Sequence, residues 1–350
     1  MIASGERIQL LERGWDRDLA HEDASPPVGR LEPDHVVVRV LACGVCHRDL
    51  IDRDGRFPFQ RFPIVPGHEA AGVVVAVGSN VRDFAVGDQV GTMHRDACGA
   101  CPSCLRGETS LCSGAAWVFG ILADGGYAAR LVAPASALYP LPASLAPVEA
   151  APLHCTFGTA YRDLVTLGRV QRGERVLVTG ANGGVGRAAI QVALRLGAQV
   201  VGVVRDERHA DSLGALGIHE VVVDAGRTFH ERIGEVDFAL DTVGAPTFLS
   251  ALRSVRVGGR AVVVGNVVAE KVPLNLGFVI TRGLTITGGS GATRTEMAAV
   301  LAMHAERPFA IAVARVFPLR RADEAQRLLR AGGVDGRFVL VPDDSLGHSN

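Results

Sequence analysis

Seven cysteines carry the first chemical signal in this chain. Four of them follow one another as Cys98, Cys101, Cys104 and Cys112, in a stretch that is rich in Gly, Ser and Pro. Such a stretch cannot build an apolar core of its own, but four thiolates can wrap one tetrahedral zinc ion, which then fixes the loop. This ligand set is complete, so the spacing predicts a structural zinc site. An iron–sulfur cluster also takes four cysteines, but this spacing does not fit the common ferredoxin patterns.

The other three cysteines are scattered, and a histidine lies in a similar setting. Cys43 and Cys46 lie in LACGVCHRDL, Cys155 lies in APLHCTFGTAY, and His68 and Glu69 lie in PIVPGHEAAG. A catalytic zinc ion typically takes three protein ligands and keeps one position open, and two cysteines with one histidine form a known set. Spacing alone does not choose among these residues, because distant ligands leave no local signature. A buried cysteine also serves as a small hydrophobic residue.

A glycine-rich turn in the second half of the chain predicts a dinucleotide site. From Arg175 the sequence reads RVLVTGANGGVGRAAIQVALRLGAQVVGVVRD, which is an apolar strand, a turn, a helical segment and a second strand. In such a βαβ unit the turn brings backbone N–H groups and a helix N-terminus to a pyrophosphate. The residues of the turn that we expect at the cofactor are Gly180, Gly183, Gly184, Val185 and Gly186.

The end of the second strand bears on which cofactor binds. An acidic residue there would bond the ribose 2′-hydroxyl of NAD, whereas an arginine accommodates the 2′-phosphate of NADP. Here the strand ends at Val204, and Arg205 and Asp206 follow. Arg205 favours NADPH, while NADH stays open if Arg205 is a solvated surface residue and Asp206 serves the ribose.

Three more apolar runs end at Asp224, Gly244 and Asn266, and the segment PTFLSALRSVRVGG between the last two is expected to be helical. Alternation of strands and helices predicts an α/β protein with a doubly wound parallel sheet. Ligands of such sheets bind at the carboxyl ends of the strands. We therefore expect Val243, Gly265 and Asn266 near the cofactor.

Composition excludes several other classes of protein. A chain of 350 residues is long enough for two domains. Its formal net charge of −1 lacks the basic excess of a duplex-DNA binder, so no nucleic-acid partner is expected. No apolar run approaches the ~20 residues that span a bilayer. The first residues, MIASGERIQLLERGWDRD, lack the apolar region of a signal peptide, so a cytoplasmic location without membrane contact is expected.

Taken in order, the Cys-His pair, GHE, the four-cysteine loop, Cys155 and GANGGVG resemble the zinc-containing medium-chain dehydrogenase/reductase family, from about residue 30 to 340. By this resemblance Cys46, His68 and Cys155 match the catalytic zinc ligands, and Glu69 matches a carboxylate that can act as an alternate ligand. Asp49 matches the carboxylate that orients the histidine, His47 a contact to cofactor phosphate, and Thr159 a residue that packs on the nicotinamide. Cys43 matches no ligand.

The resemblance also implies the architecture and two zinc ions per chain. A GroES-like β-rich catalytic domain would comprise residues 1–155 and about 288–350, with the structural zinc lobe at about 95–115. A Rossmann cofactor-binding domain would comprise residues 156–287, and the active site would lie between the two.

Two departures separate the chain from the alcohol dehydrogenases of this family. Those enzymes have Ser or Thr directly after the Cys-His pair and a histidine three residues later, which together carry away the proton of the alcohol. Here the positions hold Arg48 and Ile51. Arginine stays protonated and isoleucine has no titratable group, so the relay is missing.

The CHRD variation, the GANGGVG turn and the run from Asp241 to Val267 are similar to the acryloyl-CoA reductases and related enoyl-thioester reductases. That branch implies hydride transfer from NADPH to the β-carbon of a short 2-enoyl-CoA, such as acryloyl-, crotonyl- or 3,3-dimethylacrylyl-CoA. Arg48 and the arginines that follow, Arg53, Arg56 and Arg61, are candidates to hold coenzyme A phosphates. A solvated, partly ion-paired loop is the other interpretation of this segment. A zinc alcohol or aldehyde dehydrogenase and a catalytically silent NADPH-binding protein are the alternatives.

The segment LNLGFVITRGLTITGG is apolar and β-prone. It resembles the strand that pairs subunits in this family, which implies a homodimer or homotetramer. An interior strand of the cofactor sheet is the other interpretation.

Overall fold

The computed structural model describes residues 5–23, 30–225 and 227–343. By their contacts these residues group into two compact units. The first takes the described residues of Met1–Cys155, Thr293–Leu301 and Val313–Asn350, and the second takes those of Thr156–Ala292 and Ala302–Ala312. The second unit thus includes residues 288–292 and 302–312, which the sequence analysis assigned to the catalytic domain.

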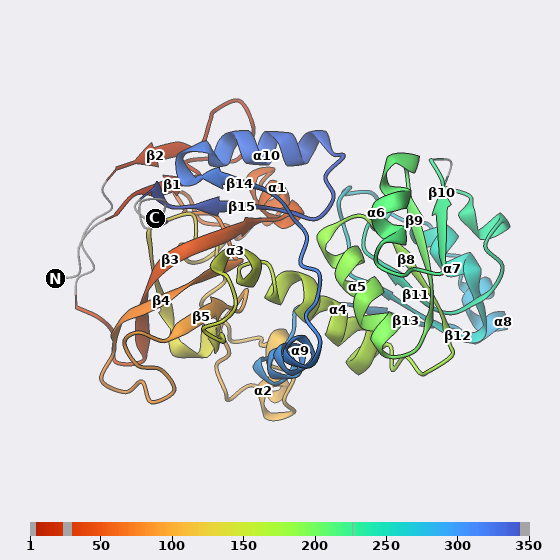
Figure 1. Cartoon of the computed structure of the whole chain (residues 1–350), viewed down its shortest axis with the longest axis horizontal. Helices are drawn as coiled ribbons and strands as arrows, with labels where there is room; N and C mark the ends of the chain where they lie inside the picture. The colour runs from red at the N-terminus through yellow and green to blue at the C-terminus, as the bar shows by residue number, and fades with distance from the viewer. Residues whose placement is uncertain (1–4, 24–29, 226, 344–350) are drawn as a thin grey trace. The chain divides into compact units, whose positions relative to one another are not determined.

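The second unit is built on a parallel sheet, drawn from green to light blue in Figure 1. Its six strands lie in the order β10-β9-β8-β11-β12-β13, and each neighbouring pair is parallel. They are β8 (Arg175–Thr179), β9 (Gln199–Val204), β10 (Glu220–Val223), β11 (Val236–Asp241), β12 (Val255–Val263) and β13 (Thr285–Gly288). The order runs outward from β8 in one direction and then from β11 in the other, so the sheet is doubly wound. The predicted α/β class is confirmed.

Helices connect the strands of this sheet. They are α5 (Gly184–Arg195), α6 (Ala210–Gly214), α7 (Phe248–Ser254) and α8 (Leu276–Arg282), and α4 (Thr159–Tyr161) precedes β8. The central strands are buried, with Leu177 and Ala239 at 0% exposure, as expected for strands covered on both faces.

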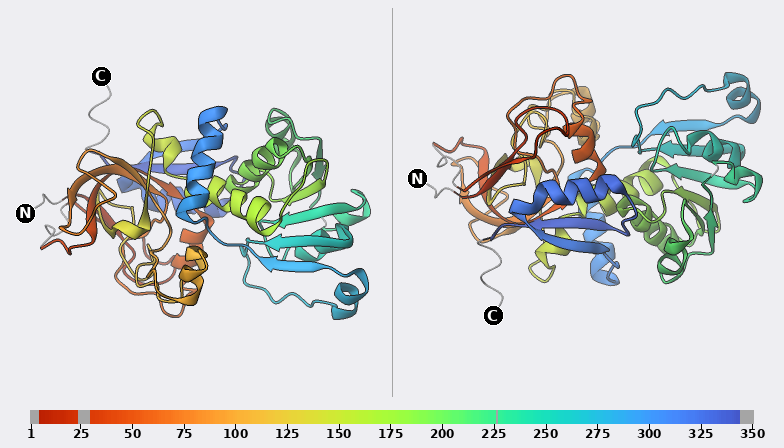
Figure 2. Two further views of the ribbon diagram at one scale, coloured as in Figure 1. Left: turned by 90° about the horizontal axis from the view of Figure 1, so that it is seen from below. Right: turned by 90° about the horizontal axis from the view of Figure 1, so that it is seen from above.

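Two sequence expectations in this unit are wrong. The helix of PTFLSALRSVRVGG ends at Ser254, and β12 begins at Val255, because β-branched valines and two glycines follow. Part of LNLGFVITRGLTITGG is helical rather than extended. The Asn275 side chain accepts a hydrogen bond from Phe278 N, and Gly283, at φ +57°, ends α8, so the caps override the β-propensity between them. The remainder forms β13 at the sheet edge, as Figure 2 shows.

The first unit contains a mostly antiparallel sheet in the order β14-β15-β3-β4-β5-β7, with β6 also paired to β3. The strands are β3 (His35–Val45), β4 (Ala70–Val77), β5 (Gln89–Thr92), β6 (Arg130–Pro134), β7 (Leu138–Pro140), β14 (Val313–Pro318) and β15 (Arg337–Val341), and β1 (Arg7–Gln9) pairs with β2 (Ala20–Glu22). The helices of this unit are α1 (His47–Arg53), α2 (Pro102–Leu105), α3 (Pro147–Ala150) and α10 (Ala322–Ala331). Helix α9 (Arg294–Glu306) begins in this unit and continues into the second unit from Ala302. Helix α10 packs on β14 and β15, which Figure 2 shows from above. None of the described helices is long and apolar enough to cross a membrane.

The pairing of β3 with its neighbours positions the ends of three strands together. Strand β3 ends at Val45, directly before Cys46, and β4 begins at Ala70, directly after Glu69. Both β4 and β15 run antiparallel to β3, so Cys43 lies opposite Ala70 and Val45 lies opposite Phe338. Residues that are distant in the sequence can therefore meet where these three strands have their ends.

Arg53 corrects a further sequence expectation. It is 0% exposed and cannot contact coenzyme A. Its guanidinium donates to the carbonyl oxygens of Gly14 and Arg17, and its Nη2 lies 2.7 Å from Asp323 Oδ1. It also stacks over the Trp15 ring at 4.2 Å. Arg53 thus ties the N-terminal loop to α10 rather than facing a ligand.

Replacing Arg53 by alanine is expected to lower the free energy of unfolding by about 3 kcal/mol, because removal of one partner leaves buried acceptors unpaired. Both tryptophans, Trp15 and Trp117, lie in the first unit, so urea unfolding followed by tryptophan emission reports on it. Arg56→Ala is the matched control and is expected to cost about 0.5 kcal/mol or less. Equal costs for the two variants would refute this assignment.

Candidate functional site

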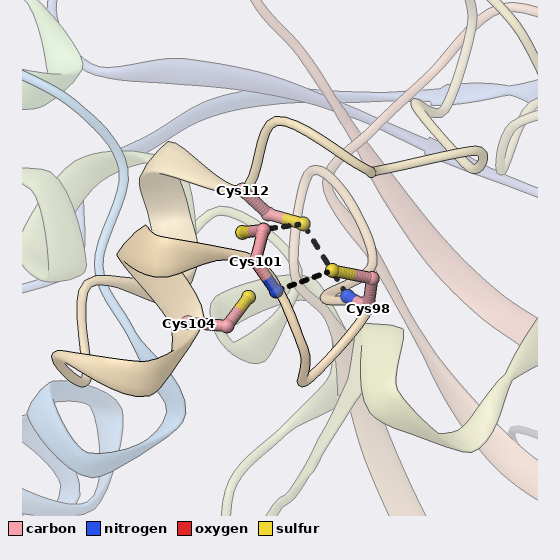
Figure 3. A group of neighbouring side chains, drawn as sticks. All are labelled: Cys98, Cys101, Cys104 and Cys112. Carbon is pink, nitrogen blue, oxygen red and sulfur yellow. Dashed lines mark hydrogen bonds between the residues drawn. The ribbon is translucent and has the colours of Figure 1, made fainter.

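The four cysteines of the loop converge, as Figure 3 shows. One sulfur atom from each of Cys98, Cys101, Cys104 and Cys112 lies within 4.8 Å of the other three. The Sγ atoms of Cys101 and Cys112 are 3.9 Å apart. A tetrahedron with Zn–S bonds of ~2.3 Å has sulfur atoms about 3.8 Å apart, so the arrangement fits zinc.

Backbone N–H groups donate hydrogen bonds to these sulfur atoms and favour the thiolate form that binds a metal cation. Cys98 Sγ accepts a hydrogen bond from Cys101 N, and Cys112 Sγ accepts one from Cys98 N, both at 3.3 Å. Cys101 is the N-cap residue of α2. The backbone N–H of Cys104 lowers the pKa of Cys101 to about 5, which favours the thiolate that binds metal.

A second donor cluster lies beside the end of β3 and the start of β4. It comprises Cys46, His68, Glu69 and Cys155, and one ligand atom of each lies within 4.8 Å of the others. Cys46 is the N-cap residue of α1, and its Sγ accepts a hydrogen bond from Arg48 N. Cys155 lies in a π-helical turn (His154–Gly158), and its Sγ is 3.8 Å from that of Cys46.

A buried hydrogen-bond chain orients the histidine. His68 Nδ1 lies 3.0 Å from Asp49 Oδ1. The other carboxylate oxygen of Asp49 accepts hydrogen bonds from Cys46 N at 2.8 Å and from the Tyr127 hydroxyl at 3.0 Å. His68 Nε2 is buried and has no hydrogen-bond partner among the described residues. A ring nitrogen that lies near two thiols and makes no hydrogen bond is the arrangement of a metal-ligating histidine.

Glu69 and Arg337 form an ion pair beside these donors. Glu69 is 0% exposed, and Arg337 Nη2 lies 3.1 Å from its Oε1 and 3.9 Å from Cys155 Sγ. Burial raises the pKa of Glu69 to about 7, although Arg337 opposes that rise. Sequence reasoning missed Arg337, because it stands at the start of β15, far along the chain, without any local motif.

Gly44 makes room for the Glu69 side chain. A Cβ atom at position 44 would lie 2.0 Å from Glu69 Oε2, which is an impossible contact. Cys43, the preceding residue, is 1% exposed and lies against Gly67 and Gly126 instead of the donor cluster. The glycine of the CGVC motif was the one signal in the sequence that pointed to this close approach.

Arg48 and Ile51, the two departures from the alcohol dehydrogenase pattern, lie on α1. Arg48 Nη2 donates to the Phe119 carbonyl at 2.8 Å, and its Nε lies 3.2 Å from Asp52 Oδ2. Asp52 is buried, which raises its pKa to about 7 against the opposing effect of Arg48. The guanidinium is therefore held by an oxygen acceptor on each side.

The glycine-rich turn lies at the carboxyl end of β8. Gly180 has φ +57°, and Gly183 is the N-cap residue of α5. A Cβ atom at Gly186 would lie 2.3 Å from the Gly180 carbonyl oxygen, so only glycine lets the helix approach this closely. Gly184 and Val185 form the first turn of α5, whose free N–H groups suit a pyrophosphate.

The carboxyl ends of β11 and β12 lie beside this turn. Thr242 Oγ1 donates to the Thr179 carbonyl at 2.8 Å and thereby joins the two strands at which the strand order reverses. A Cβ atom at Gly265 would lie 1.9 Å from the Thr242 carbonyl carbon, and Val243 O accepts a hydrogen bond from Val267 N. The structure therefore brings Val243, Gly265 and Asn266 to the predicted edge. Sequence reasoning missed Thr179 and Thr242, since threonine at a strand end is not a distinctive signal.

Arg205 and Asp206, which follow β9, differ in their exposure and contacts. Arg205 is exposed at the end of β9. The Asp206 carboxylate accepts a hydrogen bond from Arg208 N and pairs with the Arg208 guanidinium at 3.1 Å.

His47 is the first residue of α1 and Thr159 is the first of α4. The cofactor contacts expected of these two residues stay predictions.

Comparison with known families places both halves of the chain. Residues 32–143 match the family described as alcohol dehydrogenase GroES-like domain, and residues 184–306 match the zinc-binding dehydrogenase family.

Similar proteins include acryloyl-coenzyme A reductases and alcohol dehydrogenases. The chain is 34% identical over 313 residues to an acryloyl-coenzyme A reductase of Sulfurisphaera tokodaii, covering 88% of this chain and 92% of that one. It is 36% identical over 325 residues to an alcohol dehydrogenase of Geobacillus stearothermophilus, covering 89% and 92%. Among solved structures, that of AibC superposes with a TM-score of 0.90 at 38% identity, covering 97% of this chain and 96% of that one.

Gly44→Ala is expected to destabilise the first unit by about 1–3 kcal/mol, because the new Cβ displaces the Glu69 carboxylate. Glu69→Ala removes the obstructing oxygens, so the double variant is expected to lose less than the sum of the two single changes. Urea unfolding followed by tryptophan emission measures all three proteins. Strict additivity would contradict the contact between Gly44 and Glu69.

Proposed function

The chain belongs to the zinc-containing medium-chain dehydrogenase/reductase family, and within that family we propose that it reduces the C=C bond of a short 2-enoyl-CoA with NADPH. It is an NAD(P)H-dependent oxidoreductase. In the proposed reaction a hydride passes from the reduced nicotinamide to the β-carbon of the thioester, and a proton reaches the α-carbon. Acryloyl-, crotonyl- and 3,3-dimethylacrylyl-CoA are the substrates proposed.

The observation that carries this choice is the position of Arg48. Oxidation of an alcohol needs a group beside the metal that accepts the hydroxyl proton, and Arg48 is a permanent donor. Its guanidinium is already held by Phe119 O and Asp52. Ile51 supplies no titratable group further along α1. Reduction of a conjugated thioester needs no such relay, so the two departures are compatible with that chemistry.

The two donor clusters support the proposal of one structural and one catalytic zinc ion. Cys98, Cys101, Cys104 and Cys112 would hold a closed, structural ion, and Cys46, His68 and Cys155 would hold the ion at the reaction site. A zinc ion at the second position supplies Lewis-acid polarisation of the thioester oxygen. Asp49 holds the ring of His68 so that Nε2 faces the thiolates, and Arg337 holds the Glu69 carboxylate beside them. Glu69 is the alternate fourth ligand in this proposal.

The proposed cofactor preference rests on the end of β9. The Asp206 carboxylate is engaged by Arg208, while Arg205 is exposed and free to approach a 2′-phosphate. We propose that residues 156–287 form the cofactor-binding domain, with His47 and Thr159 contributing from outside the glycine-rich turn. NADH remains the weaker cofactor in this scheme.

Two further proposals concern the state of the protein in the cell. The free cysteines suit a reducing compartment, so we place the enzyme in the cytoplasm. Strand β13 is the edge strand of its sheet, and Leu276 and Ile280 on α8 are 67% and 76% exposed. An unpaired edge beside exposed apolar side chains suits pairing with a second copy, which supports a homodimer or a homotetramer.

One observation favours a second candidate function. The relative from Geobacillus stearothermophilus named alcohol dehydrogenase is slightly more identical to this chain than the acryloyl-CoA reductase is, at 36% against 34%. A zinc alcohol or aldehyde dehydrogenase is therefore the alternative, and it requires a proton path that bypasses Arg48.

The test is a steady-state assay of the purified enzyme on crotonyl-CoA with NADPH or NADH, beside ethanol and benzyl alcohol with NAD or NADP. We expect reduction of crotonyl-CoA with a lower KM for NADPH than for NADH, and alcohol turnover at least about a hundredfold weaker, since general base catalysis is worth about 10²–10⁴. Turnover of alcohols alone would replace this proposal by the alternative. Cofactor binding without any turnover would indicate a silent binding protein.

A further inference from the structure

A cavity in the first unit lies outside both cysteine clusters. It has a volume of about 530 Å³, which is in the range of small-molecule sites. Three arginines line it, Arg7 on β1, Arg61 after α1 and Arg130 on β6, together with Trp117. No part of it belongs to the glycine-rich turn or to either donor cluster.

The charges around this cavity are unbalanced. Arg7 is paired with Glu22 at 2.6 Å, but no described carboxylate pairs with Arg61 or Arg130. The acidic residue in the lining is Asp124, whose Oδ1 accepts a hydrogen bond from Val65 N. Two arginines without a carboxylate partner, Arg61 and Arg130, thus share this lining with Asp124.

The register of the sheet adds to this excess. Arg39 on β3 lies directly opposite Arg130 on β6, so the two side chains share one face. Like charges at directly opposite positions destabilise a strand pair. An anion beside Arg130 would offset that repulsion.

Two buried donors at the cavity lack acceptors. Arg130 Nε and Trp117 Nε1 are buried and make no hydrogen bond to any described residue. An unsatisfied buried donor costs about 1–3 kcal/mol, and both groups can only donate. The missing partner is therefore an acceptor. Apolar residues, among them Leu122 and Leu131, also line the cavity beside Trp117.

One segment leads from the donor cluster to this cavity. The carbonyl of Phe119 holds Arg48, the carbonyl of Gly120 accepts from Gln60 Nε2, and the carbonyl of Ile121 accepts from Arg61 N. The next residues, from Leu122 to Gly125, line the cavity. The α1 region and the cavity are thus joined by three consecutive hydrogen bonds.

We propose that this cavity binds a phosphorylated anion with a planar ring, held by Arg61, Arg130 and Arg7 and packed on Trp117. Guanidinium groups bind phosphate by paired hydrogen bonds, and aromatic side chains stack on nucleobases. The phosphoadenosine end of the coenzyme A substrate has this chemistry, and that source rests on the function proposed above. A free phosphate compound that regulates the enzyme is the other source of the same chemistry.

The experiment is isothermal titration calorimetry on the purified full chain, with saturating NADP so that its adenosine phosphates occupy the cofactor site. The probes are coenzyme A, adenosine 3′,5′-bisphosphate and inorganic phosphate. Arg61→Gln is expected to weaken binding about tenfold or more, as loss of one charge-assisted pair predicts. Arg82→Gln is the matched control, because Arg82 is an exposed arginine of the same unit that does not line the cavity.

Binding of coenzyme A and the bisphosphate, weakened by Arg61→Gln alone, supports the substrate as the source. Binding of inorganic phosphate with the same dependence on Arg61, and no competition from coenzyme A, supports the free compound. Equal binding by the two arginine variants, or no binding by any probe, overturns the proposal.

Turnover separates this proposal from the one above. Crotonyl-CoA and crotonyl-pantetheine are both reduced if the enoyl reduction is right, and only the KM of the former is expected to rise about tenfold in Arg61→Gln. A failure to reduce either thioester counts against the proposed reaction and leaves the binding result to decide the cavity.

Discussion

Charge balance in a buried space governs the first unit of this protein. Cys46, Cys155, Glu69 and Asp49 bring acidic groups into one cluster, and among their described contacts Arg337 is the guanidinium that opposes them directly. Burying charge without a partner costs several kcal/mol per ion, so a further cation would stabilise such a cluster. A dication at the centre of the thiolates and the His68 ring supplies that charge. The zinc ion proposed for the reaction site would therefore also stabilise the folded first unit.

The surrounding structure serves this requirement. The antiparallel pairing of β3 with β4 and β15 brings the donors to one edge, and Gly44 leaves the space that the Glu69 carboxylate fills. Asp49 uses both oxygens to hold the histidine, the backbone of Cys46 and the Tyr127 hydroxyl. Arg48, on the same helix, is fixed by Phe119 and Asp52, so it stays near the donors as a fixed positive charge. That charge suits the stabilisation of a developing enolate and not the removal of a proton.

How much the sequence could predict depended on whether the signal was local. The four-cysteine loop and the glycine-rich turn are local motifs, and their spacing placed them within a few residues. The second donor set lacks a local signature, and the resemblance to a family was needed to select Cys46, His68 and Cys155 from the candidates. Arg337 lies 182 residues beyond Cys155 and became visible only through strand pairing. Arg53 was misread because a charged residue in a loop-like motif normally faces solvent, whereas here it fills a buried space between the N-terminal loop and α10. The β-prone segment after Asn275 became a helix because its two caps outweigh the propensity of its interior.

The zinc content of the purified chain tests the central claim most directly. Elemental analysis is expected to give two zinc ions per chain in the unaltered protein, one in Cys46→Ser and one in Cys104→Ser, because the two donor clusters are separate. Asp49→Asn is expected to weaken the retention of one ion about 10–100-fold against a chelator, since the carboxylate orients the His68 ring. A folded and active protein in which Cys46→Ser keeps the full metal content would contradict the account.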